Sequence, residues 1–376
     1  MSGGLSEQNY FYSQAALIGT GLIGGSIGIA LREKRLVGSI VGYDCEPEAL
    51  KQAVERGAVD TPAGSALEAV YGSDLVILAV PVLNTIELLK EILPSVKKGA
   101  VITDVGSTKG WIMEAVDSLL PEKVYFIGGH PMAGSEESGI GGADPALLEN
   151  AIYVLTPRAN TPEEIFDRLS AMIGEAGAQP ILLDPMVHDR VVAAVSHLPH
   201  LTAAALVLSV AGTSDNELVR TLVAGGFRDS TRIALGNPEV WKDICTSNRW
   251  ALLASLKAFK AGLEDLEKYL LDKNEEAIEE YLRQARDYRR SIPHRGKGIL
   301  PDIFEVIVLV RDTPGVIGRL AGLLGEAGIN IDAIEILHVR ELSGGSIRLG
   351  FRSREQQQQA LHLLNEKGYT THSSAS

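Results

Sequence analysis

Short apolar runs alternate with amphipathic stretches over the first half of the chain. The runs are rich in Val and Ile and lack strict alternation, which is typical of parallel strands covered on both faces. They predict six strands, at residues 15–18, 39–43, 75–80, 100–105, 125–127 and 151–155. Stretches with helical spacing of apolar residues lie between them, for example 46–56, 85–93 and 109–120. Strands and helices in alternation predict a Rossmann-type, doubly wound α/β domain over residues 1–183.

From residue 184 the pattern changes to helical spacing with almost no strand signal. It predicts helices at residues 187–210, 216–225, 240–271 and 275–291. Helices this apolar need partners in a soluble protein, because their nonpolar faces must be covered. We therefore expect an all-α domain with substantial burial over residues 184–298.

One stretch of the helical half, residues 191–212, contains no Asp, Glu, Lys or Arg. It is interrupted by His197, Pro199 and His200, and its clean apolar part is residues 201–211. That part is far shorter than the ~20 residues that span a bilayer. We expect a helix buried inside the helical domain rather than a membrane span.

A third unit follows residues 292–302, which contain two prolines and two glycines and are interpreted as a linker. The pattern then predicts strand, helix, strand, strand and helix at residues 304–310, 315–328, 330–339, 345–351 and 354–367, with a last short strand at Tyr369. This order is typical of a small α+β domain of ferredoxin-like type, which we place at residues 302–373.

Composition and charge exclude several classes of function. Hydrophobic residues make up 45% and charged residues 22% of the chain, which indicates a globular protein. The formal net charge of −13 disfavours binding to nucleic acids and to anionic membrane surfaces. The two cysteines, Cys45 and Cys245, form no zinc motif, and residues 1–13 show no signal-peptide pattern. We expect a cytoplasmic protein that needs no metal.

Three glycines, Gly19, Gly21 and Gly24, follow the first predicted strand and open an apolar helix. The first permits a tight turn, the second lets the backbone approach a pyrophosphate, and the third lets helix and strand pack closely. Asp44 ends the next strand, where a carboxylate binds ribose hydroxyls and repels a 2′-phosphate. The pattern predicts NAD rather than NADP, bound by Asp44 and by the turn residues Gly19, Thr20, Gly21, Leu22, Ile23 and Gly24.

Further segments follow predicted strands and should line the same crevice. Ala79, Val80 and Pro81 follow one strand, and Ser107 follows the next. Ser107 is placed to bond the nicotinamide or a catalytic base, with a solvated loop serine as the alternative. His130 ends another strand, where a histidine can accept a proton from an alcohol during hydride removal. A structural histidine beside a proline turn is the alternative for His130.

Polar side chains also mark the helical half. His197 and His200 are three positions apart, so they share a helix face and indicate either a pocket for a polar ligand or two satisfied core histidines. No third residue at metal-ligand spacing accompanies them. Arg232 offers the planar guanidinium that suits a carboxylate, whereas an ordinary surface pair with Asp229 is the simpler interpretation.

Together these motifs resemble the prephenate dehydrogenase family, in its single-activity form with an appended ACT domain. The matching segments are GTGLIGGS at 19–26, DVGSTKG at 104–110, GGHPMAGSE at 128–136, SHLPH at 196–200, FRDSTRIA at 227–234, NPEVW at 237–241 and an ACT-like block at 310–331. They are spread over almost the whole chain, so the combination is specific.

The resemblance implies a reaction, in which prephenate and NAD give 4-hydroxyphenylpyruvate, CO2 and NADH, and a dimer built through the helical domain. By resemblance, His130 helps remove the proton of the ring hydroxyl, and Ser107 orients His130 and the nicotinamide. His197 and His200 would bind other polar groups of the substrate.

The family also implies roles for charged residues around the substrate. Arg232 would hold the ring carboxylate of the substrate. Glu136 and Asp229 match positions that form a gating ionic network with Arg232.

The third unit has no catalytic constellation and resembles ACT domains, which commonly bind amino acids. Asp312, Pro314 and Gly315 join its first strand to its first helix, where backbone amides can hold a carboxylate. Asn330, from the neighbouring strand or from a partner subunit, would complete an amino-acid site. Because tyrosine is the end product of the pathway, we expect feedback inhibition by tyrosine. A purely structural domain is the alternative.

Three other functions stay open. Arogenate dehydrogenase uses the same fold on the amino-acid form of the substrate. A β-hydroxyacid dehydrogenase would carry a catalytic lysine on the helix where this chain has His197 and His200. A non-catalytic sensor of NAD and amino acids would not require His130 and Arg232 together.

Overall fold

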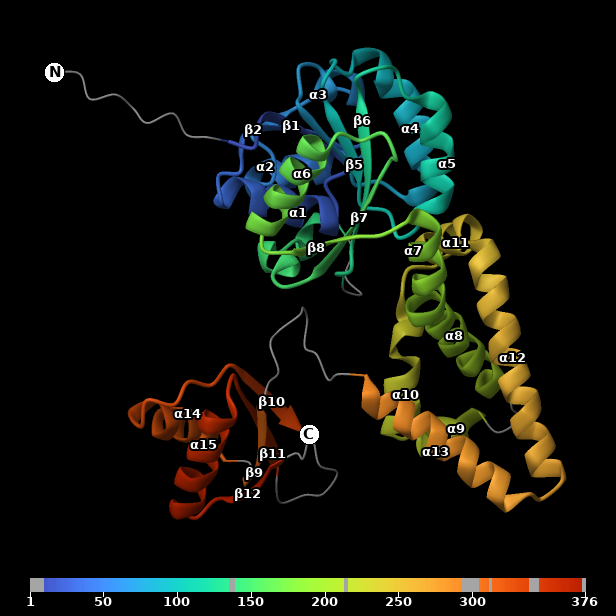
Figure 1. Ribbon diagram of the computed structural model, residues 1–376, viewed down its shortest axis with the longest axis vertical. Helices are drawn as coiled ribbons and strands as arrows, with labels where there is room; N and C mark the ends of the chain where they lie inside the picture. Colours follow the sequence, from blue (N-terminus) through green and yellow to red (C-terminus); the bar gives the residue numbers. More distant parts are fainter. Residues whose placement is uncertain are drawn as a thin grey trace. The chain divides into compact units, whose positions relative to one another are not determined.

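The computed structural model describes residues 10–134, 139–212, 216–292, 304–310, 313–337 and 345–373. The chain divides into two compact units, residues 1–298 and 299–376 (Figure 1). The first unit contains the α/β part and the helical part, and the second is the small α+β part. The fold class predicted from the sequence is confirmed for all three parts.

The α/β part is built on an eight-stranded sheet in the described residues, with the order β3-β2-β1-β4-β5-β6-β7-β8. Neighbouring strands are parallel except for β6 and β7. The strands are β1 Tyr12–Ile18, β2 Val37–Tyr43, β3 Thr61–Pro62, β4 Leu75–Leu78, β5 Val101–Asp104, β6 Tyr125–Pro131, β7 Ile152–Pro157 and β8 Gln179–Leu182. The sequence pattern found six of them and missed β3 and β8.

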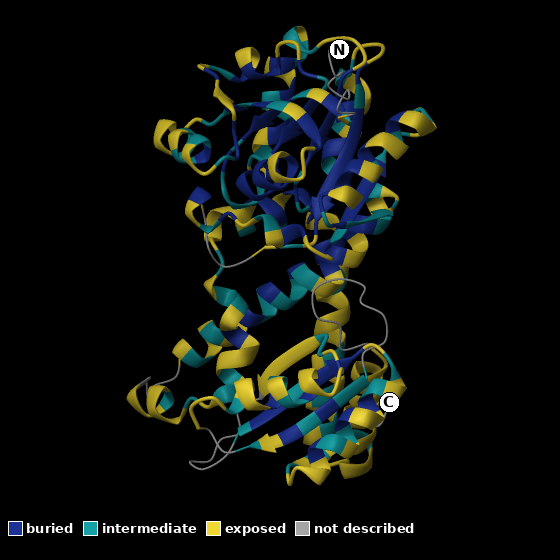
Figure 2. Ribbon diagram, turned by 90° about the vertical axis from the view of Figure 1, so that its left-hand side faces the viewer, coloured by how far each residue is buried: buried dark blue, intermediate teal, exposed yellow. Residues whose placement is uncertain are grey.

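Helices cover both faces of this sheet, as doubly wound folds require (Figure 1). One apolar core lies under α1 Leu22–Glu33, α2 Pro47–Glu55 and α6 Glu163–Glu175. The other lies under α3 Ala66–Val70, α4 Thr85–Ile92 and α5 Gly110–Leu119. The strands are accordingly buried (Figure 2), which explains why their sequences are apolar runs without alternation.

The helical part begins with one helical stretch that changes its geometry part-way. Helix α7 Pro185–Val192 runs into a π-helical turn, Ala193–His197, and then into α8 Leu198–Ala211. Pro199 lies in the first turn of α8, directly after the π-helical turn. The remaining helices are α9 Asn216–Leu222, α10 Gly225–Thr231, α11 Pro238–Ser247, α12 Arg249–Leu271 and α13 Glu275–Ser291.

The expectation that residues 191–212 are buried within the helical domain is wrong for the single chain. The stretch Pro185–Ala211 is long and apolar enough to cross a membrane by length and composition, and 28% of its most apolar window is buried. The π-helical turn joins α7 to α8 without a break, so the apolar stretch is longer than the sequence suggested. Leu206 and Leu208 of α8 are 41% and 72% exposed.

The second unit has the order βαββαβ. Its elements are β9 Phe304–Val310, α14 Val316–Glu326, β10 Ala333–Leu337, β11 Gly345–Phe351, α15 Arg354–Glu366 and β12 Thr370–Ser373. The antiparallel sheet has the order β10-β11-β9-β12, and its buried residues pack with those of α14 and α15. The predicted last short strand is β12. Of the predicted linker, only Ile292 lies within the described residues.

Candidate active site

The strand order reverses between β1 and β4, and the carboxyl ends of β1, β4, β5 and β6 meet at one edge of the sheet. In doubly wound sheets, the crevice outside this point is where ligands bind. The glycine turn after β1, the segment after β4, Ser107 after β5 and His130 in β6 therefore share one edge, as the sequence predicted.

The glycine turn leaves no room for side chains at two of its three glycines. Gly19 has a φ of +90°, and a Cβ there would lie 2.3 Å from the carbonyl oxygen of Ala79. A Cβ on Gly24 would lie 2.1 Å from the carbonyl oxygen of Gly19. A Cβ on Gly21 would meet nothing within 4 Å, so open space faces the backbone there.

The residues around this space suit a dinucleotide. Helix α1 starts after Gly21 without a side-chain cap, so its first amides are available to a pyrophosphate. Asp44 follows β2 and is held by the backbone N–H and hydroxyl of Thr20, at 2.6 and 2.9 Å, and by the N–H of Glu46 at 3.0 Å. A carboxylate held at this place is the ribose partner expected for NAD.

His130 lies in β6 with 8% of its surface exposed. Its Nδ1 atom is 2.8 Å from Nε2 of His188 in α7. Nδ1 of His188 is in turn 2.8 Å from Oδ1 of Asp189, and both residues are fully buried. The candidate base is thus the first member of a His–His–Asp chain that crosses from the α/β part to the helical part.

Asp189 also completes the start of α5. Its Oδ1 accepts the N–H of Lys109 at 2.7 Å, and its Oδ2 accepts the N–H of Gly110 at 2.8 Å. No side chain of α5 itself caps this end. A carboxylate of α7 therefore takes the place of the N-cap residue of α5 and binds the two parts together.

A buried lysine lies behind His130. The ammonium of Lys109 is ion-paired with Asp104 at the end of β5 and donates to the carbonyl oxygen of Gly129 at 2.7 Å. Asp104 also accepts the N–H of Gly129 at 3.1 Å and that of Gly106 at 2.8 Å. Because a buried charge needs such partners, this cluster holds the end of β6 against β5.

Burial keeps His130 and His197 neutral. Desolvation lowers the pKa of His130 well below 6.5, and the positive charge of Lys109 adds to the effect. Desolvation lowers the pKa of His197 to about 4. At neutral pH both rings are therefore uncharged.

His197 and His200 both contact Trp241 of α11. The ring of His200 stacks on the indole with centroids 3.5 Å apart, and the ring of His197 meets it edge-on at 6.0 Å. Nδ1 of His197 lies 3.3 Å from the amide nitrogen of Asn248, which also donates to the carbonyl oxygen of Asp189 at 2.8 Å. Nδ1 of His200 is buried without a hydrogen-bond partner.

Other predicted residues are placed less closely. Ser107 is half-buried, and within the described residues no hydrogen bond joins it to His130. Arg232 begins a 3₁₀ turn after α10, and both it and Asp229 are exposed. Glu136 lies outside the described residues, and so does Asp312 of the second unit.

Sequence reasoning missed the residues that hold the histidines. His188 and Asp189 are the clearest cases, followed by Lys109, Asp104 and Asn248. The available signal was the adjacent polar pair at 188–189, four positions after the Asp184–Pro185 helix start. Within the described residues no group of His, Cys, Asp or Glu is arranged to hold a metal ion.

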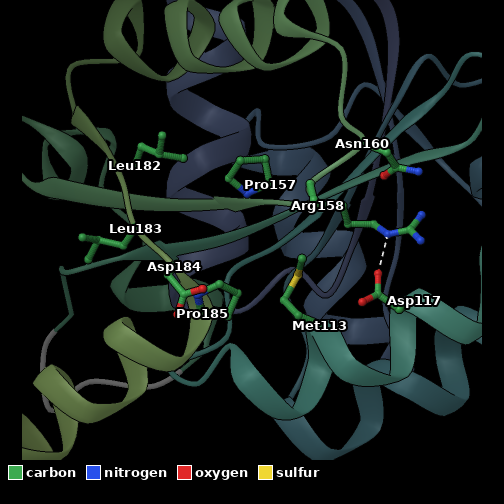
Figure 3. Close-up of a pocket in the computed structure, with 10 residues that line it drawn as sticks. Met113, Asp117, Pro157, Arg158, Asn160, Leu182, Leu183, Asp184 and Pro185 are labelled. Atoms are coloured by element: carbon green, nitrogen blue, oxygen red, sulfur yellow. Dashed lines mark hydrogen bonds and ion pairs between the residues drawn. The ribbon is translucent and has the colours of Figure 1, made fainter.

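A hollow of about 590 Å³ lies elsewhere, between α5 and the ends of β7 and β8 (Figure 3). Its lining includes the ion pair of Arg158 and Asp117, at 2.7 Å. None of the predicted site residues lines it, so it is separate from the crevice that holds His130.

Comparison with known proteins identifies the architecture. Residues 27–182 match the family model "Prephenate dehydrogenase, nucleotide-binding domain", residues 184–284 match "Prephenate dehydrogenase, dimerization domain", and residues 304–355 match "ACT domain". A prephenate dehydrogenase of Bacillus subtilis is 36% identical over 354 residues, which cover 93% of this chain and 95% of that protein. The chain belongs to the prephenate dehydrogenase family. The resemblance inferred from its motifs is confirmed.

Two solved structures are similar to about three quarters of the chain. Prephenate dehydrogenase of Aquifex aeolicus, in complex with hydroxyphenyl propionate and NAD+, has a TM-score of 0.70 and 32% identity over 75% of this chain and 98% of that one. Synechocystis arogenate dehydrogenase has a TM-score of 0.65 and 32% identity over 74% of this chain and 99% of that one. Like these relatives, the chain is a dehydrogenase with the NAD-binding domain of the family.

Proposed function

We propose that this enzyme oxidises and decarboxylates prephenate, with His130 as the base that takes the proton of the ring hydroxyl. One observation carries the proposal: Nδ1 of His130 is occupied by His188, which leaves Nε2, at the crevice edge of the sheet, for the substrate. A neutral, desolvated imidazole at neutral pH is the proton acceptor that this step needs.

NAD supplies the hydride acceptor when it is bound. Gly19 to Gly24 and Asp44 would hold its pyrophosphate and ribose, and Ala79, Val80, Pro81 and Ser107 would line the same crevice. Uptake of the hydroxyl proton by His130 lets the C4 oxygen become a carbonyl-like group as the C4 hydrogen leaves with its electron pair. The electrons of the bond between the ring and its carboxylate then complete an aromatic ring as CO2 leaves. The former hydroxyl oxygen, now a phenolate, takes the proton back from His130.

The other polar side chains have complementary proposed roles. His197 and His200 would bind substrate oxygens, and Arg232 would hold a carboxylate through its planar guanidinium. Glu136 and Asp229 would form an ionic gate with Arg232. Support for the two histidines is their burial beside Trp241.

Steady-state NADH formation with prephenate and with arogenate tests the substrate. We expect a higher kcat/KM with prephenate, as the relation to the Bacillus enzyme suggests. A higher kcat/KM with arogenate would overturn the choice of substrate.

The role of His130 as the base is tested by substitution. His130→Asn should lower kcat by ~10²–10⁴-fold and leave NAD binding intact. An effect on KM alone would show that His130 is not the base.

We also propose a homodimer built through the helical part. Apolar side chains of α8 and α12 are exposed in the single chain, including Leu208 at 72% and Leu253 at 59%, and the matching family model is a dimerization domain. Sedimentation of the native enzyme and of Leu208→Glu should give a dimer and a monomer, respectively.

The cysteines are free, which suits the cytoplasmic location that we propose.

The second unit would bind tyrosine as a feedback inhibitor. The family model that matches it is an ACT domain, and α14 starts at Gly315, with a φ of +81° and no side-chain cap. The amides at this start would hold the amino-acid carboxylate. Pro314 precedes this start, whereas Asn330 follows the other end of α14 and donates to Asp332 at 3.1 Å, so Asn330 would complete the site only from a partner subunit. Asp312, which lies outside the described residues, is proposed for the same site from the sequence alone.

A further inference from the structure

We propose that His188 and Asp189 are positioning residues that set the tautomer of His130 and share the positive charge it acquires. The inference deepens the proposed function, since it rests on His130 being the base. The inference rests on three buried side chains, His130, His188 and Asp189, which are connected one after the other by two contacts of 2.8 Å.

The order of donors along the chain follows from the carboxylate. Asp189 already accepts two backbone N–H groups, so its carboxylate is an acceptor on both oxygens. The hydrogen on the 2.8 Å contact must therefore sit on Nδ1 of His188, which leaves Nε2 of His188 as an acceptor. Nδ1 of His130 must then carry the hydrogen of the next contact, and Nε2 of His130 bears the lone pair.

This tautomer is the one that a base needs. When the substrate O–H bond breaks, the proton forms an N–H bond with Nε2 of His130, and the oxygen keeps the electron pair. His130 becomes an imidazolium whose Nδ1–H already points at His188. That hydrogen can pass to Nε2 of His188, which places the positive charge beside the carboxylate of Asp189.

His197 provides an internal contrast. The amide nitrogen of Asn248 donates to a carbonyl oxygen and also faces Nδ1 of His197, so that Nδ1 is an acceptor. The hydrogen of neutral His197 is then on Nε2. The two histidines thus have opposite tautomers: His130 accepts a proton, and His197 donates a hydrogen bond.

Among the groups around His130, His188 is the one that can accept the proton and the positive charge that His130 acquires. The groups that face His130 from other elements are His188 and Asp189 of α7, His197 of the π-helical turn, and Lys109 with its counter-ion Asp104. Lys109 is a cation already paired with Asp104. Of the two neighbouring histidines, His188 alone has a carboxylate on its far nitrogen within the described residues.

Two substitutions of His188 distinguish its effect on the tautomer of His130 from its ability to take up the positive charge. In His188→Gln, the amide oxygen can still accept from His130 but cannot become cationic. In His188→Ala, both roles are lost. We expect kcat to fall by ~10-fold or more in the Gln variant and by ~10²–10⁴-fold in the Ala variant, with KM for prephenate changed by less than about threefold. His362→Gln, on the exposed face of α15, is the matched control and should behave as the unmodified enzyme.

A pH profile and NMR distinguish positioning from mere support of the fold. His188 and Asp189 stabilise the cationic form of His130, so replacing His188 by Gln should make His130 harder to protonate and move the acid limb of kcat/KM to lower pH. In the resting enzyme labelled with ¹⁵N-histidine, Nδ1 of His130 should be pyrrole-type and Nε2 pyridine-type. Unchanged NAD affinity and thermal midpoint show that a variant is folded, and a variant that fails this check is judged by the NMR result of the unmodified enzyme.

The outcomes are distinct for the two proposals. Pyridine-type Nδ1 in His130, or a Gln variant with unchanged kcat and acid limb, would overturn the inference. If His130→Asn retains full activity, the base role itself is wrong, whatever the tautomer. Loss of activity in His130→Asn together with an inert His188→Gln leaves the base role standing and removes the role of His188.

Discussion

Three buried histidines show how one residue type acquires different chemistry from what its Nδ1 atom faces. Nδ1 of His130 faces another histidine, Nδ1 of His197 faces an amide, and Nδ1 of His200 has no hydrogen-bond partner. Stacking on Trp241 holds the His200 ring in place instead. The roles in a site of this kind are thus set by neighbours that do not touch the substrate.

The lowered pKa of His130 makes a prediction about pH. Its neutral form is the base, so activity is lost only when pH falls through this lowered pKa. We expect kcat/KM for prephenate to stay flat from neutral pH to well below 6.5. An acid limb centred at 6.5 or above would contradict this. In the unfolded chain, His130 is exposed and binds a proton near its usual pKa of about 6.5. The free energy of unfolding should therefore decrease as pH falls below about 6.5.

Arg232 is the second residue whose role can be measured directly. If it grips a substrate carboxylate, Arg232→Ala should raise KM for prephenate by about tenfold or more, because one side of a charged contact is removed. Arg232→Lys should recover part of the loss, since an ammonium lacks the planar fork. Steady-state kinetics on both variants decides the matter, and an unchanged KM in the Ala variant would make Arg232 an ordinary surface residue.

At the scale of elements, Gly21 and Gly24 in the turn that leads into α1 meet different surroundings. Gly24 is required for packing, because a Cβ would meet the backbone of Gly19. Gly21 has room for a side chain as far as the protein is concerned. A substitution at Gly24 therefore tests the stability of the fold, and a substitution at Gly21 tests cofactor binding.

The contrast predicts opposite results for two alanine substitutions. Gly24→Ala should lower the free energy of unfolding, by about 1–3 kcal/mol, because the backbone has to shift. Gly21→Ala should keep the thermal midpoint and weaken NAD binding by tenfold or more, since its methyl group enters the space proposed for the pyrophosphate. Thermal melts and NAD titration measure the two effects. Normal NAD affinity in a folded Gly21→Ala would place the cofactor elsewhere.

Most elements could be predicted from the sequence, and the failures have physical causes. Buried strands such as β4 are apolar throughout, so their pattern is strong. Strand β3 has two exposed residues, and the residues of β8 are intermediate or exposed, so neither has such a pattern. Proline and two histidines suggested an interruption near residue 197, but a π-helical turn that ends at His197 connects the two helices, and Pro199 lies in the first turn of α8.

The candidate site was predictable only as far as local motifs reach. The glycine turn and His130 lie in motifs whose spacing carries the chemistry. The contact between His130 and His188 joins residues 58 positions apart, and no local pattern encodes it. Asp189 caps a helix that starts 79 positions earlier in the chain, which is invisible before the two parts are folded together.

At the scale of the whole molecule, the division into two compact units allows regulation to be tested separately from catalysis. The second unit starts after residue 298. A chain ending at Gly298 should keep its activity with prephenate and lose most of its inhibition by tyrosine. Titration of tyrosine against both forms measures this. Equal inhibition of both forms would show that tyrosine competes at the active site and that the second unit is not its receptor.

The cap that Asp189 places on α5 has a consequence for the order of events during synthesis. The α/β part leaves the ribosome first, and domains generally fold in that order. It then contains the glycine turn and His130, but α5 still lacks its cap and His130 still lacks His188. A half-made chain can therefore hold a dinucleotide without a prepared base. By this order, chemical competence comes after the cofactor-binding turn is made, and regulation through the second unit would come last.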